Sequence, residues 1–386
     1  MFIADIDDWF LGLDRAETVK EFFDELLAPV DIRINGDRPW DIQVHNPDLY
    51  PRVIGEWSLG LGEAYMDGWW TAEAVDQFFY KLFRGGVSAR LMPFSKKVFL
   101  LKSKMFNRQN RQQAREVVDL HYELDVDLFM SFLDPYNQYT CGYFQDTDDL
   151  NAAQEQKLDL ICRKLRLGPE DRVLDIGCGW GGFAKFAAEH YQCHVTGISI
   201  ADVQIAYARE FCQGLPVEIV KSDYRDHRGS YDKILCCGMI EAVGYKNYRP
   251  FFEMVHRNLK DDGLFLLHTI SRHDSGTATD PWIDKYIFRN GMLPSAQQLS
   301  VAAEDLFALN DWHNFGAYYD PTLMAWNRNF SDNWDRFKEH YDEAFYRMWE
   351  YYFLSCAGSF RANEKQLWQV VYGKWPGAVA GYQSVR

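Results

Sequence analysis

A glycine-rich loop with an acidic residue in front of it stands near the middle of the chain, as Asp175-Ile-Gly-Cys-Gly-Trp-Gly181. Gly177, Gly179 and Gly182 match the G-x-G-x-x-G spacing of dinucleotide sites, so the glycines alone do not identify the ligand. Glycines allow the backbone to approach a ligand closely at the start of a helix. The Asp175 carboxylate can hold an amino group through charge-assisted hydrogen bonds, but it has little use beside a pyrophosphate. The loop therefore favours a nucleotide that carries an amino group.

The pattern D-x-G-x-G resembles the first motif of the S-adenosylmethionine-dependent methyltransferases. The resemblance implies that this loop surrounds the methionine part of S-adenosylmethionine, and a purely structural glycine turn is the remaining alternative. The residues expected to contact the cofactor here are Asp175, Gly177, Cys178, Gly179 and Gly181.

Two further patches follow the next predicted strands and fit the other end of such a cofactor. Ser199 and Gln204 stand where a ribose is expected, although the acidic residue that many nucleotide sites place here is missing. Asp223 and Tyr224 offer a hydrogen bond and an aromatic edge to an adenine. Each patch alone is only suggestive, because Asp223 is explained equally well as a turn cap.

The elements that must position these residues form an alternating pattern from about residue 158 onward. Short β-branched runs alternate with helical segments, which is typical of an open and largely parallel α/β sheet. The predicted strands cover 172–177, 194–198, 217–220, 233–238 and 264–270, with a last candidate at 366–373. The predicted helices between them cover 180–190, 201–212 and 248–259. This doubly wound class places ligands at the carboxyl ends of the strands.

The first 115 residues show no nucleotide motif and are predicted to be mostly helical. Ten basic residues and no acidic residue lie between Lys81 and Arg115, and Phe94, Val98 and Leu101 share one helical face there. A basic amphipathic helix can lie on an anionic membrane surface, but its apolar face can equally pack on the core of its own domain. Both interpretations remain open.

Composition restricts the classes of function that this chain can have. The 386 residues carry a net charge of −15, which argues against a nucleic-acid partner. No apolar run approaches the roughly 20 residues that a membrane span needs. The eight cysteines form no C-x-x-C pair and no disulfide framework, so neither zinc nor any other metal is expected. We expect a cytoplasmic enzyme with reduced cysteines.

A longer set of motifs resembles one family, the bacterial two-domain cyclopropane fatty acid synthases. The motifs recur almost end to end and in the same order. They are Ser58-Leu-Gly-Leu-Gly-Glu-Ala-Tyr-Met-Asp-Gly-Trp-Trp70, Leu133-Asp-Pro135, Tyr139-Thr-Cys141, the Asp175 loop, Gly238-Met-Ile-Glu241, His268-Thr-Ile270 and Trp312-His-Asn-Phe-Gly316. Resemblance to this family implies an enzyme that adds a methylene from S-adenosylmethionine across the cis double bond of a phospholipid acyl chain.

The resemblance also implies a bicarbonate ion beside the methyl group, which would serve as general base. Its expected ligands are Cys141, Glu241, His268, Tyr319 and the Ile270 backbone, and Tyr139 and Thr140 are expected to lie against the cofactor. The alkene attacks a sulfonium methyl and leaves a carbocation, so a base must then remove a proton from the added methyl for the ring to close. Taken singly, each of these residues is better explained as a structural residue, and only their joint presence in the resemblance favours the catalytic interpretation.

The resemblance further implies a helical domain over 1–115 that tethers the enzyme to the inner face of the membrane, a catalytic domain over 116–386, and a homodimer. Two departures from the family pattern are Asp125-Val126 in place of Gly-Asn and Ala242 in place of the usual His. They leave two alternatives open. One is a methyltransferase that stops at a methyl branch or acts on another lipid or small amine, and the other is a catalytically degraded lipid-binding protein.

Overall fold

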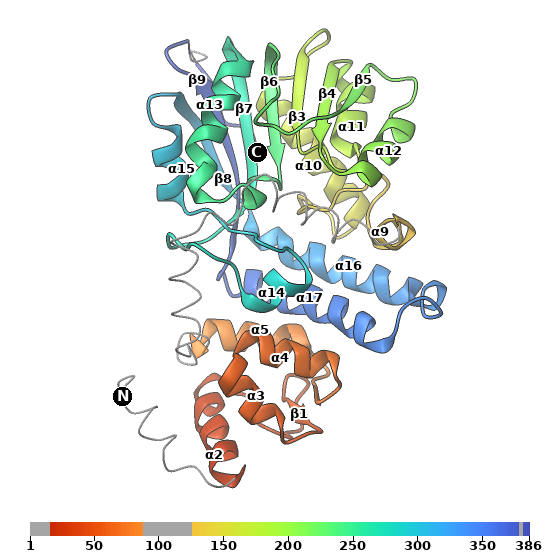
Figure 1. The fold of residues 1–386 in the computed structure, drawn as a ribbon, viewed down its shortest axis with the longest axis vertical. Helices are drawn as coiled ribbons and strands as arrows, with labels where there is room; N and C mark the ends of the chain where they lie inside the picture. The colour runs from red at the N-terminus through yellow and green to blue at the C-terminus, as the bar shows by residue number, and fades with distance from the viewer. Residues whose placement is uncertain (1–15, 88–125, 378–380) are drawn as a thin grey trace.

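The computed structural model of the protein describes residues 16–87, 126–377 and 381–386 (Figure 1). A seven-stranded sheet with flanking helices forms one end of the molecule, and a group of short helices forms the other. The expected domain boundary at 115/116 and the predicted basic helix near 94–105 lie outside the described residues.

The sheet has the order β5-β4-β3-β6-β7-β9-β8. Its strands are β3 (Arg172–Ile176), β4 (His194–Ser199), β5 (Val217–Lys221), β6 (Tyr231–Cys237), β7 (Leu259–Ser271), β8 (Phe307–Asn314) and β9 (Gln366–Lys374). β9 pairs antiparallel with β7 and β8, and the remaining pairs are parallel. This arrangement confirms the predicted doubly wound fold. β8 was not predicted, because most of this edge strand is only half-buried and lacks a continuous apolar run.

Helices cover both faces of the sheet, which is why most residues of its central strands β3 and β7 are buried. They are α10 (Leu150–Leu165), α11 (Gly182–Tyr191), α12 (Asp202–Phe211), α13 (Tyr248–Asn258) and α15 (Ala296–Ala303). The strand order reverses between β3 and β6, since β4 lies on one side of β3 and β6 on the other. Ligands of doubly wound sheets bind at such a reversal, and the glycine loop follows β3 there.

A layer of aromatic helices lies between the sheet and the N-terminal helices (Figure 1). It contains α9 (Val126–Phe132), α14 (Pro281–Tyr286), α16 (Tyr319–Asn333) and α17 (Glu343–Arg361). Phe132, Trp326, Trp349 and Phe353 are fully buried or nearly so and pack ring against ring. The aromatic residues of this layer thus belong to one core that reaches into the N-terminal helices.

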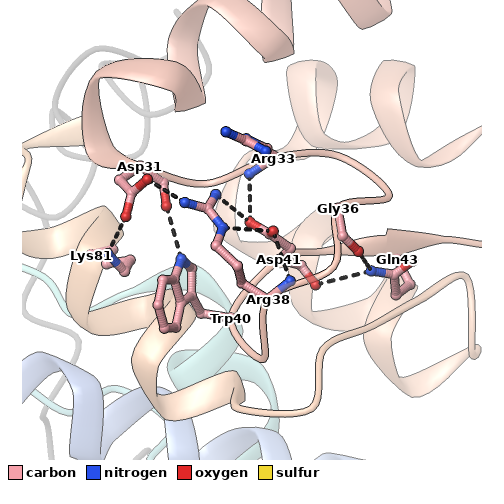
Figure 2. Close-up of polar contacts among 8 residues, drawn as sticks. All are labelled: Asp31, Arg33, Gly36, Arg38, Trp40, Asp41, Gln43 and Lys81. Atoms are coloured by element: carbon pink, nitrogen blue, oxygen red, sulfur yellow. Dashed lines mark hydrogen bonds and ion pairs between the residues drawn. The ribbon is translucent and has the colours of Figure 1, made fainter.

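The N-terminal helices are α2 (Ala16–Leu27), α3 (Leu49–Glu56), α4 (Ser58–Met66) and α5 (Val75–Arg84), with a two-stranded sheet of β1 (Gln43–Val44) and β2 (Trp70–Thr71). Figure 2 shows the polar contacts that hold the loop between α2 and β1. Arg38 and the Arg33 backbone donate hydrogen bonds to buried Asp41. Burial opposes ionisation, but these bonds outweigh it and lower the pKa of Asp41 to about 2. Asp31 bonds Lys81 at 3.0 Å and so ties this loop to α5.

α5 packs directly on α17 because one glycine removes the side chain that would separate them. A Cβ atom at Gly358 would lie 2.6 Å from the Asp76 carbonyl oxygen and 2.7 Å from the Tyr80 nitrogen. Beside it, Arg361 of α17 bonds Asp76 of α5 at 2.6 Å and Asp320 of α16 at 2.7 and 2.8 Å. The N-terminal helices are therefore joined to the aromatic layer by close backbone packing and a partly buried ionic link.

We expect Gly358→Ala to destabilise the protein by about 1 to 3 kcal/mol, because the two helix backbones must move apart. Gly55→Ala is the matched control, since a Cβ at Gly55 in α3 would meet nothing within 4 Å. Alanine favours a helix over glycine by up to about 1 kcal/mol, so this control should hold or raise the melting temperature. Calorimetric melting of both variants checks this, and equal midpoints would contradict the packing argument.

Candidate active site

The glycine loop lies at the end of β3 with its backbone turned toward a large cavity. Gly177 and Gly179 have φ angles of 78° and 53°, which glycine adopts without strain. A Cβ at Gly179 would meet nothing within 4 Å, so the loop is open at this point. Asp175 is 2% exposed, and burial raises the pKa of its carboxyl to about 7 although Lys157 lowers it. A cation beside Asp175 would therefore be strongly favoured.

The Tyr139-Thr140 segment is held in place by a buried lysine that the sequence analysis missed. Lys157 of α10 is 0% exposed, and its Nζ donates to Gln138 Oε1 at 2.5 Å and to Thr140 Oγ1 at 2.9 Å. Gln154 Nε2 donates to the Thr140 carbonyl oxygen at 2.7 Å. Burial lowers the pKa of Lys157. The available signal was a lysine on the apolar stripe of α10, where a solvated charge does not belong.

Glu241 and His268 present buried polar atoms to the same space. Glu241 lies in the short 3-10 helix Ile240–Ala242, and the Ile270 backbone nitrogen donates to its Oε1 at 2.8 Å. Glu241 Oε2 and His268 Nε2 are buried and have no hydrogen-bond partner among the described residues. Burial raises the pKa of Glu241 to about 7, although the hydrogen bond from Ile270 lowers it.

The tautomer of His268 is indicated by the hydrogen bond that its other ring nitrogen forms with Gln369. With the Gln369 amide in the orientation of this structure, its Nε2 donates to His268 Nδ1 at 3.3 Å, which leaves the proton of the neutral ring on Nε2. Burial holds the pKa of His268 well below its usual range, and Lys157 and Lys164 act in the same direction. A neutral imidazole thus holds a buried N–H donor without a partner among the described residues, on a side chain that lines the same cavity as Glu241. This donor and this carboxyl suit a small oxyanion that itself carries a proton.

Cys141 and Tyr319, the other two predicted bicarbonate ligands, are both buried. Cys141 is 0% exposed, and Thr322 Oγ1 donates to its Sγ at 3.8 Å. Burial raises the pKa of Cys141, so it remains a neutral thiol and is a poor nucleophile. Tyr319 stacks on Phe360 with ring centroids 4.4 Å apart. Burial raises the pKa of Tyr319 well above its usual range, and the nearby Cys141 and Glu241 add to this effect.

One cavity of about 930 Å³ connects most of the predicted site residues. Those that line it are Tyr139, Thr140, Asp175, Gly177, Cys178, Gly179, Gln204, Glu241, His268, Ile270 and Tyr319. Ala242, the departure from the family pattern, lines it as well. Within the described part of the chain, no cluster of three or more His, Cys, Asp or Glu side chains has metal-site geometry.

Five predicted residues are not in the cavity wall. Cys141 is buried behind it, and a Cβ at Gly181 would lie 3.0 Å from Ala208 of α12, so that glycine serves helix packing. Ser199 Oγ accepts a hydrogen bond from the Ala201 nitrogen. The remaining two residues, Asp223 and Tyr224, contact neighbouring protein groups. Arg225 donates hydrogen bonds to both carboxylate oxygens of Asp223, and Tyr224 packs edge-on against Phe251. Contacts of these residues with the cofactor remain predictions.

Comparisons with known proteins agree with this geometry. The family model described as mycolic acid cyclopropane synthetase matches residues 109–370. The chain is 49% identical over 91% of its length to cyclopropane-fatty-acyl-phospholipid synthase of Escherichia coli K12, covering 92% of that protein. It is 31% identical over 84% of its length to tuberculostearic acid methyltransferase of Mycobacterium tuberculosis, covering 81% of that protein.

Among solved structures, mycolic acid cyclopropane synthase complexed with SAH and CTAB matches with a TM-score of 0.63 and 28% identity. The match covers 67% of this chain and 97% of that protein. The sheet order, the glycine loop and the cavity are accordingly those of a class I methyltransferase. The chain therefore belongs to the mycolic acid cyclopropane synthetase family and is an S-adenosylmethionine-dependent transferase.

Proposed function

We propose that this enzyme forms a cyclopropane ring at the cis double bond of an unsaturated phospholipid acyl chain. The observation that carries the proposal is the cavity, whose wall includes the Asp175 loop together with Glu241 and His268, each of which has a buried polar atom without a hydrogen-bond partner among the described residues. S-adenosylmethionine would supply the methyl group, with its amino group at Asp175. The name of the Escherichia coli relative supports a phospholipid acyl chain as the substrate.

The residues beside Glu241 fit bicarbonate, which would supply a base close to the transferred methyl group. His268 offers an N–H donor, and Glu241, with a pKa near 7, can accept or donate a hydrogen bond. Cys141 and Tyr319 would add neutral S–H and O–H groups. The Ile270 nitrogen is already bonded to Glu241, so we assign it to orienting that carboxyl. When Glu241 is protonated it is neutral, so it would not repel a bound negative ion.

The surrounding aromatic side chains have a role of their own. Tyr139 lies against Trp326, with centroids 5.2 Å apart, and Tyr319 against Phe360. Such rings exclude water from a developing cation and face it with π electrons. The site can therefore protect a carbocation on the acyl chain until the ring closes.

We infer that the protein reaches its substrate by binding to the surface of the membrane. None of the helices in the described residues is long and apolar enough to span a bilayer. The acid-free stretch from Lys81 to Arg115 supports contact with anionic lipid, and the helices before it would form the tethering domain of residues 1–115. The homodimer remains a prediction from the family resemblance, which sedimentation of the full chain would check.

The experiment that tests the proposed function combines the purified protein with S-adenosylmethionine and vesicles of an unsaturated phospholipid. We expect a product heavier by one carbon whose proton NMR spectrum contains upfield ring signals. We also expect the rate to fall in buffer stripped of bicarbonate and to recover when it is restored. If the lipid is unchanged although the protein binds S-adenosylmethionine, a lipid-binding role is the better account.

A second candidate is a methyltransferase that leaves a methyl branch without closing the ring. Two observations favour it, namely the 31% identity to a tuberculostearic acid methyltransferase and Ala242 in the cavity wall. The alanine side chain cannot form a hydrogen bond, whereas the histidine expected from the family resemblance can. Ala242 therefore gives less help to the removal of a proton from the added methyl group. The same NMR spectrum separates the two, because a branched product lacks the upfield ring protons.

A further inference from the structure

The cavity that holds the candidate active site continues into the N-terminal helices. Its wall passes from Asp175 and His268 along α17 to side chains that belong to residues 23–87. We call this part the N-terminal compartment, and Phe23, Val44 and Phe83 are among its lining residues. One space thus connects the reacting groups with a part of the molecule that contains none of the predicted cofactor residues.

The passage between the two parts is built from two helix faces. On α17 the lining residues are Tyr351, Tyr352, Ser355, Cys356, Ser359 and Phe360, which share one side of the helix. On α5 they are Phe78, Phe79, Leu82 and Phe83. Close packing at Gly358 and the Arg361 link to Asp76 hold these two helices together. The passage is therefore part of the folded molecule, with walls held on both sides.

The two ends of the cavity differ in chemistry. Among the described residues that line the N-terminal compartment, none is charged, and most side chains are aliphatic or aromatic. The charged lining residues all come from position 175 onward, and they include Arg272, Arg289 and Lys365. A phosphate moved into the N-terminal compartment would lose its hydration and find no ionic partner there, whereas a hydrocarbon chain would gain by leaving water.

We propose that the N-terminal compartment binds the methyl-terminal segment of the reacting acyl chain, beyond its double bond. The inference rests on the proposed function, which requires the double bond to lie beside the methyl donor. The chain then needs an apolar wall on its far side, and the N-terminal compartment is the apolar continuation of that site. The N-terminal helices thereby select substrates by the length of chain that follows the double bond.

The test uses two lipids that differ only in this segment. Palmitoleoyl and oleoyl chains have the same spacing from carboxyl carbon to double bond, but oleoyl has two more methylenes beyond it. Both lipids are mixed in the same vesicles, so membrane binding affects them equally and the product ratio reports only specificity. Each buried methylene contributes about fourfold to binding. Losing the space for two of them should change the ratio by on the order of tenfold.

Val44→Phe fills the compartment at a half-buried position on β1, where an aromatic residue suits a strand. We expect it to lower the oleoyl-to-palmitoleoyl product ratio by on the order of tenfold. Phe83→Ala enlarges the compartment and should raise the same ratio, or extend activity to a longer distal segment. Val301→Phe is the matched control, because Val301 is 62% exposed on α15 and is absent from the cavity wall. It should leave the ratio unchanged.

Three outcomes would overturn the inference. The product ratio of Val44→Phe and Phe83→Ala could equal that of the unmodified protein while ring formation continues. The ratio could also change equally in Val301→Phe. The third outcome comes from lipids in which the reacting chain is kept constant and the length of the saturated chain of the same phospholipid is varied. If the product ratio of the variants changed with the length of the saturated chain, that chain would occupy the compartment. Failure of the proposed function can be distinguished from these three outcomes, because the unmodified protein would then form no ring from either lipid.

Discussion

Glu241→Gln is expected to lower the rate of ring formation by roughly two to four orders of magnitude, the usual contribution of a positioned acid or base. The glutamine keeps the size of the side chain and can still accept the hydrogen bond from the Ile270 nitrogen. It cannot titrate, and its amide nitrogen or oxygen must replace Oε2, which has no other partner among the described residues. Single-turnover assays with vesicles measure the rate, and calorimetry should show unchanged S-adenosylmethionine binding.

The same substitution should make the protein more stable at neutral and alkaline pH. The folded state raises the pKa of Glu241 from 4.5 to about 7, so the native protein retains a proton that the unfolded chain has lost. Stability from this group is complete below pH 4.5 and declines as pH rises to about 7. Above pH 7 the cost is on the order of 3 kcal/mol. Glu241→Gln removes this cost, so its unfolding free energy should fall less between pH 5 and 8.

Glu253→Gln is the matched control for both measurements. Glu253 lies on α13, and its exposed carboxylate bonds Arg249 at 3.1 Å on the surface. The control should leave the rate unchanged and shift stability by less than about 1 kcal/mol. If Glu241→Gln retained most of the activity, the carboxyl would not orient the base. If its stability followed the same pH curve as the unmodified protein, the raised pKa would be contradicted.

Asp175→Asn is expected to weaken S-adenosylmethionine binding by at least about 30-fold, the loss found when one partner of a buried charge pair is removed. In the unmodified protein the Asp175 pKa is near 7, so part of the population must release a proton when the cationic cofactor binds. Affinity should therefore rise with pH up to about 7 and then level off. Calorimetry in buffers of different ionisation enthalpy measures the released proton, which should disappear in the variant.

Asp148→Asn serves as the control for this experiment, because Asp148 is exposed in the loop before α10, away from the cavity wall. It should alter neither the affinity nor the proton release. If Asp175→Asn bound S-adenosylmethionine as tightly as the unmodified protein, the amino group of the cofactor would have to bind a residue other than Asp175. Weaker binding with proton release unchanged would assign the titration to Glu241, whose pKa is also near 7.

Much of the catalytic half could be predicted because its signals are local. The strand β7 contains a continuous apolar run over 264–267, and the D-x-G-x-G loop between a strand and a helix specifies its own backbone shape. β8 escaped prediction because an edge strand with half-exposed residues carries no such run. The order of strands around β3 then places the loop at the point where ligands bind.

By itself, the sequence determined the fold class and the nucleotide loop, and through family resemblance it predicted which residues carry the chemistry. Tertiary structure decided how those residues behave. The proton on His268 Nε2 depends on Gln369, a residue 101 positions away, and the pKa of Glu241 depends on burial under elements distant in the chain. Buried Lys157 and the apolar compartment among residues 23–87 were likewise invisible, because burial and cavity shape arise only when separate segments pack together.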